Sequence, residues 1–261
     1  RNVDIKTGID AGTFTELRAA FVEHGLIFLR DQDITPDDHI AFAERWGKIN
    51  INRFFPRLDG YDQIATVTKE PDQTTNIGGG WHTDHSYDHV PAMGSILIAR
   101  ETPPVGGDTL FACMYTAYDT LSDGLKQTLE GLKAVHSSRH IFGEQSSYRD
   151  TMKDRFSNPE DATQDAVHPV VITHPESGRK ALYVNPGFTL HFDGWTAAES
   201  KPLLDYLYAH AVQLEHTTRF QWAPGSIAFW DNRCTWHYAL NDYHGTRREM
   251  HRITIEGSPI N

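Results

Sequence analysis

The sequence predicts an α+β protein with a double-stranded β-helix, or jelly-roll, core and flanking helices. Short apolar or alternating runs, separated by Gly, Pro and Asp, fill most of the chain, as is typical of a core built from many short strands. Helix signals are concentrated early and late in the chain, which is typical of an α+β protein. No repeat, low-complexity tract or linker divides the 261 residues, so we expect one domain covering residues 1–261.

Three helices are indicated by the residues at their starts. Residues 13–16 have the form of a capping box, and Phe14, Leu17 and Phe21 then fall on one helical face. Residues 35–38 supply an N-cap threonine, a proline at the first helical position and acidic residues in the first turn. Residues 196–199 repeat the capping box and precede an apolar stripe that reaches Ala211. All three are predicted to cover the core.

The remaining apolar or alternating runs predict strands. They are residues 26–30, 63–68, 94–99, 109–112, 132–137, 169–173, 181–184, 226–230 and 249–256.

Composition restricts the partners and the compartment. The formal net charge is −11 and no run rich in Lys or Arg is present, so we expect no nucleic acid and no anionic membrane as a partner. No apolar run reaches the roughly 20 residues of a membrane helix. Cys113 and Cys234 predict neither a disulfide framework nor a thiolate metal site, which favours a cytoplasmic location. The oligomeric state, including a homo-oligomer, stays open.

Histidines paired with acids are the first candidates for a metal site. His82 and Asp84 form an H-x-D pair, and on extended backbone residues i and i+2 share a face, so both could reach one ion. Glycines 78–80 leave room for close backbone approach just before this pair. A second pair, His191 and Asp193, has turn character and is interpreted as a surface loop. Two such pairs are about the number expected by chance, so the motif alone carries little weight.

More distant residues strengthen the first pair. His237 follows a strongly apolar run, and two histidines with one carboxylate form the facial triad of non-haem Fe(II) oxygenases. Arg248 lies 11 residues further on and would share one strand face with Arg252. Two inward guanidinium groups need anions, and bidentate pairing with carboxylates would supply them. Taken alone, His237 is equally compatible with a core or surface role, and the arginines with a solvated edge strand.

These motifs, taken together, resemble the taurine dioxygenase family of Fe(II)/2-oxoglutarate enzymes over nearly the whole chain. The resemblance is carried by residues 24–32, 81–84, 106–109, 168–171, 184–185 and 230–233 and by the strand that begins at Arg248. It implies that His82, Asp84 and His237 bind iron. It also implies that Arg248 holds the far carboxylate of 2-oxoglutarate, with Thr109 donating a hydrogen bond to that carboxylate.

The resemblance also implies a set of substrate-binding positions. Arg252 matches an arginine that contacts an acidic substrate, and Phe188 matches an aromatic wall of the pocket. Taurine-using members carry other residue types at four positions, where this chain has Asn52, Phe55, Gly78 and His85. Loss of polar partners there predicts poor taurine binding. Phe55, with its neighbour Phe54, suggests a more apolar substrate body, although both are equally compatible with the core.

The function implied by this resemblance is that of a dioxygenase. It would use Fe(II), 2-oxoglutarate and O₂ to hydroxylate a small anionic substrate such as a sulfonate, a sulfate ester or an aryloxyalkanoate, with cleavage of a carbon–heteroatom bond where the new hydroxyl adjoins one. Two alternatives use the same triad: a zinc-dependent hydrolase or isomerase, and a non-catalytic metal-binding module. A polar stretch at residues 145–163 predicts a lid over the site.

Overall fold

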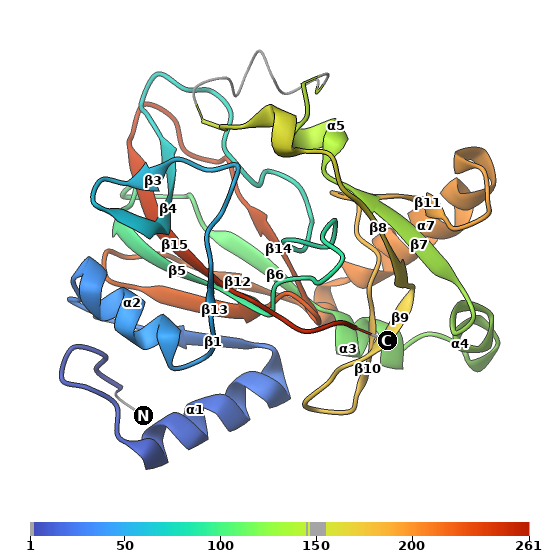
Figure 1. Cartoon of the computed structure of the whole chain (residues 1–261), viewed down its shortest axis with the longest axis horizontal. Coiled ribbons are helices and arrows are strands. Elements are labelled where there is room, and N and C mark those ends of the chain that lie inside the picture. Colours follow the sequence, from blue (N-terminus) through green and yellow to red (C-terminus); the bar gives the residue numbers. More distant parts are fainter. Residues whose placement is uncertain (1–2, 145, 147–154, 261) are drawn as a thin grey trace.

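A large antiparallel sheet lies at the centre of the protein, as the computed structural model shows for residues 3–144, 146 and 155–260 (Figure 1). Within these ranges the sheet has seven strands in the order β1-β13-β5-β15-β4-β3, with β2 paired to β15. The strands are β1 (Leu26–Leu29), β2 (Ile49–Asn50), β3 (Arg57–Leu58), β4 (Tyr61–Lys69), β5 (Gly94–Glu101), β13 (Ile227–Asp231) and β15 (Arg248–Ile255).

Three smaller sheets, also antiparallel, complete the β-structure of the described ranges. The first has the order β12-β6-β14, the second β11-β7-β8 and the third β10-β9. Their strands are β6 (Thr109–Cys113), β7 (Lys133–Ser137), β8 (Asp165–Pro169), β9 (Val171–Thr173), β10 (Lys180–Leu182), β11 (Thr189–Phe192), β12 (Thr217–Phe220) and β14 (Thr235–Ala239).

Helices lie outside the sheets. In Figure 1, α1 (Ala11–His24) and α2 (Pro36–Glu44), both blue, lie beside the large sheet, and α7 (Ala197–Ala211), orange, lies by β11. The shorter helices are α3 (Met114–Asp119), α4 (Asp123–Leu129), α5 (Arg139–Phe142), η1 (Pro159–Asp161) and η2 (Leu214–His216). In the described part of the chain, no helix combines the length and the apolar character needed to cross a membrane. The antiparallel sheets with peripheral helices confirm the predicted α+β class.

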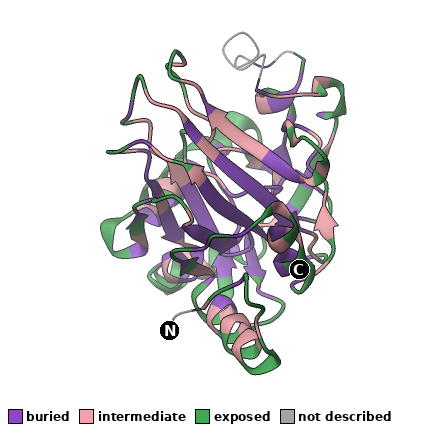
Figure 2. Ribbon diagram, turned by 90° about the vertical axis from the view of Figure 1, so that its left-hand side faces the viewer, coloured by how far each residue is buried: buried purple, intermediate pink, exposed green. Residues whose placement is uncertain are grey.

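Three strands of the large sheet, β5, β13 and β15, are buried along most of their length, so their side chains on both faces are covered (Figure 2). On one face, Ile253 and Ile255 of β15 pack in the cluster that contains Phe21 and Phe42 of the two N-terminal helices. On the other face, Met250 of β15 packs in a cluster that includes side chains of β6 and β12. This second face, enclosed between two sheets, is the one that also carries the two buried arginines of β15.

The helix predictions are confirmed, apart from one helix start. Thr35 and Thr196 are N-caps with complete capping boxes, as expected. The first helix, however, begins at Ala11 instead of at the predicted capping box of residues 13–16. Asp10 is its N-cap, because the carboxylate accepts a hydrogen bond of 2.9 Å from the backbone N–H of Thr13. An aspartate is as good a cap as the threonine, and the sequence pattern did not separate the two.

Each of the nine predicted strands overlaps an observed one. The run at 169–173 is divided, because β8 ends at Pro169 and β9 begins at Val171. Five short strands were missed: β2, β3, β11, β12 and β14. In β14 the neighbours Trp236 and His237 are both buried, so it lacks the alternation that marks a half-buried strand. The predicted lid within 145–163 lies partly outside the described residues.

Candidate metal and cosubstrate site

His82 and His237 face each other across a single β-bridge. The backbone N–H of His237 donates to the carbonyl of His82 over 2.8 Å, and the N–H of His82 donates back over 3.2 Å. The ring centroids are 4.1 Å apart. Asp84 follows where the chain turns away, so the H-x-D pair lies on one bridge residue and a turn instead of a full strand. One potential ligand atom from each of the three residues lies within 4.8 Å of the others.

Hydrogen bonds orient the first histidine and the carboxylate. Nδ1 of His82 donates to the carbonyl of Gly80 over 2.8 Å, which leaves Nε2 free, 3.8 Å from Oδ1 of Asp84. The other oxygen, Oδ2 of Asp84, accepts from the hydroxyl of Ser95 over 3.0 Å. Nη1 of Arg252 donates to both oxygens, over 3.2 Å to Oδ2 and 3.3 Å to Oδ1. Ser95 thus contacts Oδ2, while Oδ1 is the oxygen that lies near Nε2 of His82.

The electrostatics of the three groups suit a divalent metal. Burial would raise the pKa of Asp84, but Arg252 and the two histidines hold it well below its usual range, so the carboxyl is ionised. Burial, followed by the neighbouring His82, lowers the pKa of His237, so its imidazole is neutral. A carboxylate and neutral imidazoles are the forms that bind metals. Nδ1 of His237 is buried and has no hydrogen-bond partner among the described residues, and this donor set fits Fe(II).

Two glycines make room for His82. Gly78 has φ +75°, and a Cβ there would lie 3.3 Å from Cε1 of the imidazole. A Cβ on Gly187 would lie only 2.6 Å from the Cβ of His82, a contact that no real side chain makes. Both glycines therefore permit the backbone to pass close to the His82 side chain.

Two buried residues, His168 and Asn185, form hydrogen bonds to the turn after Asp84. Nε2 of His168 lies 3.0 Å from the carbonyl of Asp88, to which it donates. The amide of Asn185 donates to the hydroxyl of Ser86 over 3.0 Å and accepts from the backbone N–H of Phe188 over 2.9 Å. These bonds fix the turn that carries the carboxylate, and they give a physical reason for the His-Pro and Val-Asn motifs of the sequence.

A second buried cluster contains His174, Asp231 and Cys234. Asp231 accepts from Nε and Nη2 of Arg233 over 2.8 and 2.6 Å and from Nε2 of His174 over 3.0 Å. Nδ1 of His174 accepts from the backbone N–H groups of residues 176 and 177. Both ring nitrogens are thus occupied, so this network stabilises the β13–β14 turn and does not leave a ligand for a metal.

Arg248 lies in the middle of the large sheet, because β15 is flanked by β4 and β5. The alternative of solvated arginines on an edge strand is therefore wrong. Its Nε and Nη2 are buried and have no partner among the described residues. Burial lowers the pKa of this guanidinium, an effect that Tyr243 and Asp108 partly oppose. A buried cation without a counter-ion points to an anionic ligand.

Thr109 and Arg248 both lie close to Trp222. The indole N–H of Trp222 donates to Oγ1 of Thr109 over 2.9 Å, and the ring centroid of Trp222 is 5.9 Å from Cζ of Arg248. With its oxygen occupied as an acceptor, the threonine hydroxyl keeps its own proton for donation. Thr109 and Arg248 together can therefore offer donors to one carboxylate.

Aromatic side chains gather near Arg252 and His82. The guanidinium carbon of Arg252 lies 4.4 Å from the ring centroid of Phe55, and the ring of Phe188 lies 6.1 Å from that of His82. The cluster includes Phe54, Phe55, Tyr87, Phe142 and Phe188. Phe54 stacks on Phe142 at 4.4 Å, so this residue belongs to the packed part of the cluster.

Two further predicted substrate residues, Asn52 and His85, form hydrogen bonds to neighbouring parts of the chain. The side-chain oxygen of Asn52 accepts from the backbone N–H groups of Phe54 and Phe55 over 2.9 and 3.1 Å, so Asn52 shapes the segment that carries them. His85 has φ +60°, a conformation uncommon for a non-glycine residue. Its Nδ1 donates to Asp88 over 2.8 Å, and its Nε2 is buried without a partner in the described ranges.

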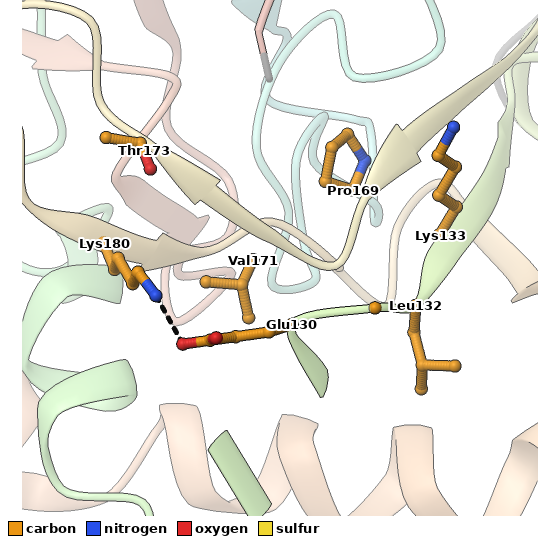
Figure 3. Close-up of a pocket in the computed structure, with 8 residues that line it drawn as sticks. Glu130, Leu132, Lys133, Pro169, Val171, Thr173 and Lys180 are labelled. Atoms are coloured by element: carbon orange, nitrogen blue, oxygen red, sulfur yellow. Dashed lines mark hydrogen bonds and ion pairs between the residues drawn. The ribbon is translucent and has the colours of Figure 1, made fainter. Parts of the chain in front are cut away.

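Two other places, the second H-x-D pair and a surface pocket, contain none of the predicted metal ligands. His191 lies at the end of β11 instead of in a loop, and the exposed Asp193 follows it; neither belongs to the two metal-ligand clusters. A surface pocket near the Lys180–Glu130 ion pair contains none of the predicted site residues (Figure 3). Its lining is Glu130, Gly131, Leu132, Lys133, Pro169, Val171, Thr173 and Lys180.

Sequence reasoning missed two residues that orient the site, Ser95 and Trp222. Ser95 stands at the start of an apolar strand and is fully buried, so a lone polar residue within an otherwise apolar run was the available signal. Trp222 follows β12, one of the missed strands, and nothing in the sequence marked it as close to Thr109.

Comparison with known proteins identifies the family. The family model described as "Taurine catabolism dioxygenase TauD, TfdA family" matches residues 1–254. An alpha-ketoglutarate-dependent sulfate ester dioxygenase from Pseudomonas putida is 33% identical over 260 residues, covering 98% of this chain and 85% of that protein. An (S)-phenoxypropionate/alpha-ketoglutarate-dioxygenase from Sphingobium herbicidovorans is 34% identical over 257 residues, covering 96% and 88%.

A crystal structure of a taurine dioxygenase from Burkholderia xenovorans superposes with a TM-score of 0.83 at 32% identity, covering 99% of this chain and 86% of that one. None of these relatives supports the zinc-dependent or non-catalytic alternatives. The chain belongs to the TauD, TfdA family and is a 2-oxoglutarate-dependent dioxygenase that uses Fe(II) and O₂.

Proposed function

We propose that the enzyme hydroxylates a small organic anion with an apolar body, and that sulfate esters and aryloxyalkanoates fit it better than taurine does. The observation that carries this proposal is the position of Arg252, which lies between Asp84 of the triad and the ring of Phe55. A guanidinium placed there can pair with an anionic group while the aromatic cluster packs on the substrate body. Relatives that act on a sulfate ester and on a phenoxypropionate support both classes.

His82, Asp84 and His237 are proposed to hold Fe(II). Two imidazoles and one carboxylate on one face of the ion leave open positions for a chelating cosubstrate and for O₂. Bound iron supplies the activation of O₂, while the protein orients the reactants and excludes water. Overall, one oxygen atom enters the substrate and the other enters succinate, with release of CO₂ from 2-oxoglutarate.

Arg248 and Thr109 are proposed to bind the far carboxylate of 2-oxoglutarate. Nε and Nη2 of Arg248 are free donors, and the hydroxyl of Thr109 is oriented by Trp222. Bidentate guanidinium–carboxylate pairing would satisfy the buried cation and fix the cosubstrate in one orientation. The chelating end would then reach the triad.

The substrate body is proposed to contact a set of residues on the Arg252 side of the triad. Phe55 and Phe188 would form aromatic walls, and Gly78 would leave space beside His82. Asn52 would act through the position of Phe55, whose backbone it holds. His85 would offer its unpartnered Nε2. Hydroxylation of the carbon next to the ester or ether oxygen gives an adduct that breaks its C–O bond, leaving an aldehyde or keto product and the sulfate or the phenol.

We further propose a jelly-roll core, in a single domain over residues 1–261. This is supported by the large sheet and the β12-β6-β14 sheet, which share the apolar cluster that contains Met250, Phe111 and Phe220. A cytoplasmic location is supported by the free thiols of Cys113 and Cys234. A homo-oligomer and a lid within residues 145–163 stay predictions.

Succinate release tests the proposed substrate class. Purified enzyme with Fe(II), 2-oxoglutarate and O₂ is supplied with alkyl sulfate esters, aryloxyalkanoates, taurine or the neutral alcohol of each ester. We expect the first two classes to raise succinate release well above the substrate-free rate, and Arg252→Met to remove that stimulation. Taurine as the best substrate, or neutral alcohols as effective as the anions, would overturn the proposal.

A further inference from the structure

Lys69 and Arg248 are neighbours in the large sheet. Strands β4 and β15 are antiparallel, and their register places Lys69 directly opposite Arg248. Opposite residues of an antiparallel pair point to the same face, with Cβ atoms about 4.5–5.5 Å apart. Both side chains are buried, at 2% and 6% exposure. Two cationic side chains therefore start from neighbouring positions on the sheet face that is enclosed by the smaller sheet.

The ammonium group of Lys69 has neutral partners. It donates to the side-chain oxygen of Asn241 over 2.8 Å and to the carbonyl of Tyr243 over 2.7 Å, and it lies 4.0 Å from the centre of the Tyr243 ring. In the described ranges, neither Lys69 nor Arg248 forms an ion pair with a carboxylate. The positive charge of both groups is thus uncompensated.

A third cation lies close to this pair. Nη1 of Arg155 donates to the carbonyl of Thr75 over 2.6 Å and Nη2 to the carbonyl of Thr68 over 3.1 Å, again neutral partners. Burial lowers the pKa of Lys69, and Arg155 lowers it further. Burial raises the pKa of the Tyr243 hydroxyl, which the guanidinium groups of Arg248 and Arg155 oppose. Among the described residues, Lys69 and Arg155 therefore have neutral hydrogen-bond partners, and none of the three cations has a carboxylate at ion-pair distance.

Like charges directly opposite each other destabilise a sheet, and burial adds to that cost. An anion at this place would reverse both effects. Arg248 offers a planar fork of donors, whereas the compact ammonium of Lys69 has one proton left after its bonds to Asn241 and Tyr243. The two groups can thus approach one carboxylate from different sides.

We propose that Lys69 is a second cationic residue for the far carboxylate of 2-oxoglutarate, acting beside Arg248. The inference rests on the proposed placement of that carboxylate at Arg248 and deepens it. The chelating end of the cosubstrate lies towards the triad and away from Lys69. Loss of the Lys69 charge should consequently weaken ligands that carry the far carboxylate and spare ligands that lack it.

Calorimetric titration of the Mn(II)-loaded protein tests this, because Mn(II) replaces Fe(II) without turnover. Lys69→Gln keeps a donor for its carbonyl partner while it removes the charge, and Lys133→Gln, at an exposed site on β7, is the matched control. The ligands are 2-oxoglutarate and oxalate, which has a chelating end but no far carboxylate. We expect Lys69→Gln to weaken 2-oxoglutarate about tenfold and to leave oxalate within about twofold. The control should change neither.

Unchanged 2-oxoglutarate affinity in Lys69→Gln would overturn the inference. Equal weakening of 2-oxoglutarate and oxalate, or a parallel loss of Mn(II), would also overturn it, because a merely structural lysine affects all three. Failure of the underlying placement gives a different result: Arg248→Met would then bind 2-oxoglutarate as tightly as the parent protein does.

Discussion

The hydroxyl of Ser95 donates a 3.0 Å hydrogen bond to Oδ2 of Asp84. Nη1 of Arg252 donates to both oxygens of this carboxylate, over 3.2 Å to Oδ2 and 3.3 Å to Oδ1. The two groups together restrict its orientation, in which Oδ1 lies 3.8 Å from Nε2 of His82. The orientation of the proposed metal ligand is therefore set by Ser95 and Arg252, which lie outside the proposed triad. Such partners orient a ligand and set its basicity, so they influence metal affinity.

Replacement of Ser95 by Ala should weaken metal binding. The carboxylate loses a donor that fixes its orientation, and loss of such outer partners typically costs about 10–100-fold in metal affinity or activity. Titration of the metal-free protein with Mn(II) measures this. Ser138→Ala is the control, since that hydroxyl is equally buried and has no partner among the described residues. Equal affinity in the two variants would show that Ser95 does not orient the carboxylate.

Arg248→Met should act in opposite directions on ligand binding and on stability. Without its guanidinium, the protein should lose 2-oxoglutarate affinity by about 3–5 kcal/mol, as when one partner of a buried charge pair is removed. The ligand-free protein should unfold less readily, because a buried cation without a counter-ion is replaced by an apolar side chain. Chemical denaturation and calorimetric titration measure the two effects.

Arg233→Met is the contrasting variant for this experiment. In the parent protein the guanidinium of Arg233 is paired with Asp231 at 2.6 Å and with Glu176 at 3.1 Å. Its removal takes the cationic partner away from the buried carboxylate of Asp231. We expect a loss of about 3–5 kcal/mol in the free energy of unfolding. If both arginine variants destabilise the protein to the same extent, Arg248 has a partner and is not a vacant anion-binding group.

The sequence identified the three residues of the candidate triad, but it did not identify the strand that carries His237 or the hydrogen bond from Ser95 to Asp84. His82, Asp84 and His237 were predicted as a triad because metal ligands are restricted to a few residue types, and the structure brings their potential ligand atoms within 4.8 Å of one another. The strand that carries His237 was not recognised, because burial of both Trp236 and His237 hides the two-residue period. Ser95 acts through a contact between residues 11 positions apart, which depends on how β5 packs against the turn and not on local pattern.

Trp222→Phe should weaken 2-oxoglutarate moderately and leave the metal unaffected. The variant keeps an aromatic ring near Arg248 but removes the N–H that donates to Oγ1 of Thr109. The hydroxyl can then rotate, and the loss of one oriented hydrogen bond is worth about 0.5–1.5 kcal/mol, or a few-fold in affinity. Titration with 2-oxoglutarate measures it. Thr109→Val should remove the same bond, so the double variant should be no weaker than Thr109→Val alone.

The stability of the fold should fall between pH 7.5 and pH 5.5, in part through His39. This histidine is fully buried on α2, and burial, with a smaller effect of Arg100, lowers its pKa to about 3. Its pKa in the unfolded chain is close to the ordinary value of 6.5. Between these values the unfolded state binds a proton that the folded state does not bind, so stability rises with pH. The contribution is complete above pH 6.5 and is lost as the pH falls towards 3.

His39→Leu isolates this contribution. Over the interval from pH 7.5 to 5.5 a single such histidine costs about 1 kcal/mol of folding free energy. The leucine variant should therefore lose about that much less than the parent protein does when urea denaturation is compared at the two pH values. His244→Leu, at an exposed position, should keep the parent's full pH dependence. If the two leucine variants show the same pH dependence, His39 is protonated in the folded protein and its burial does not exclude the charged form.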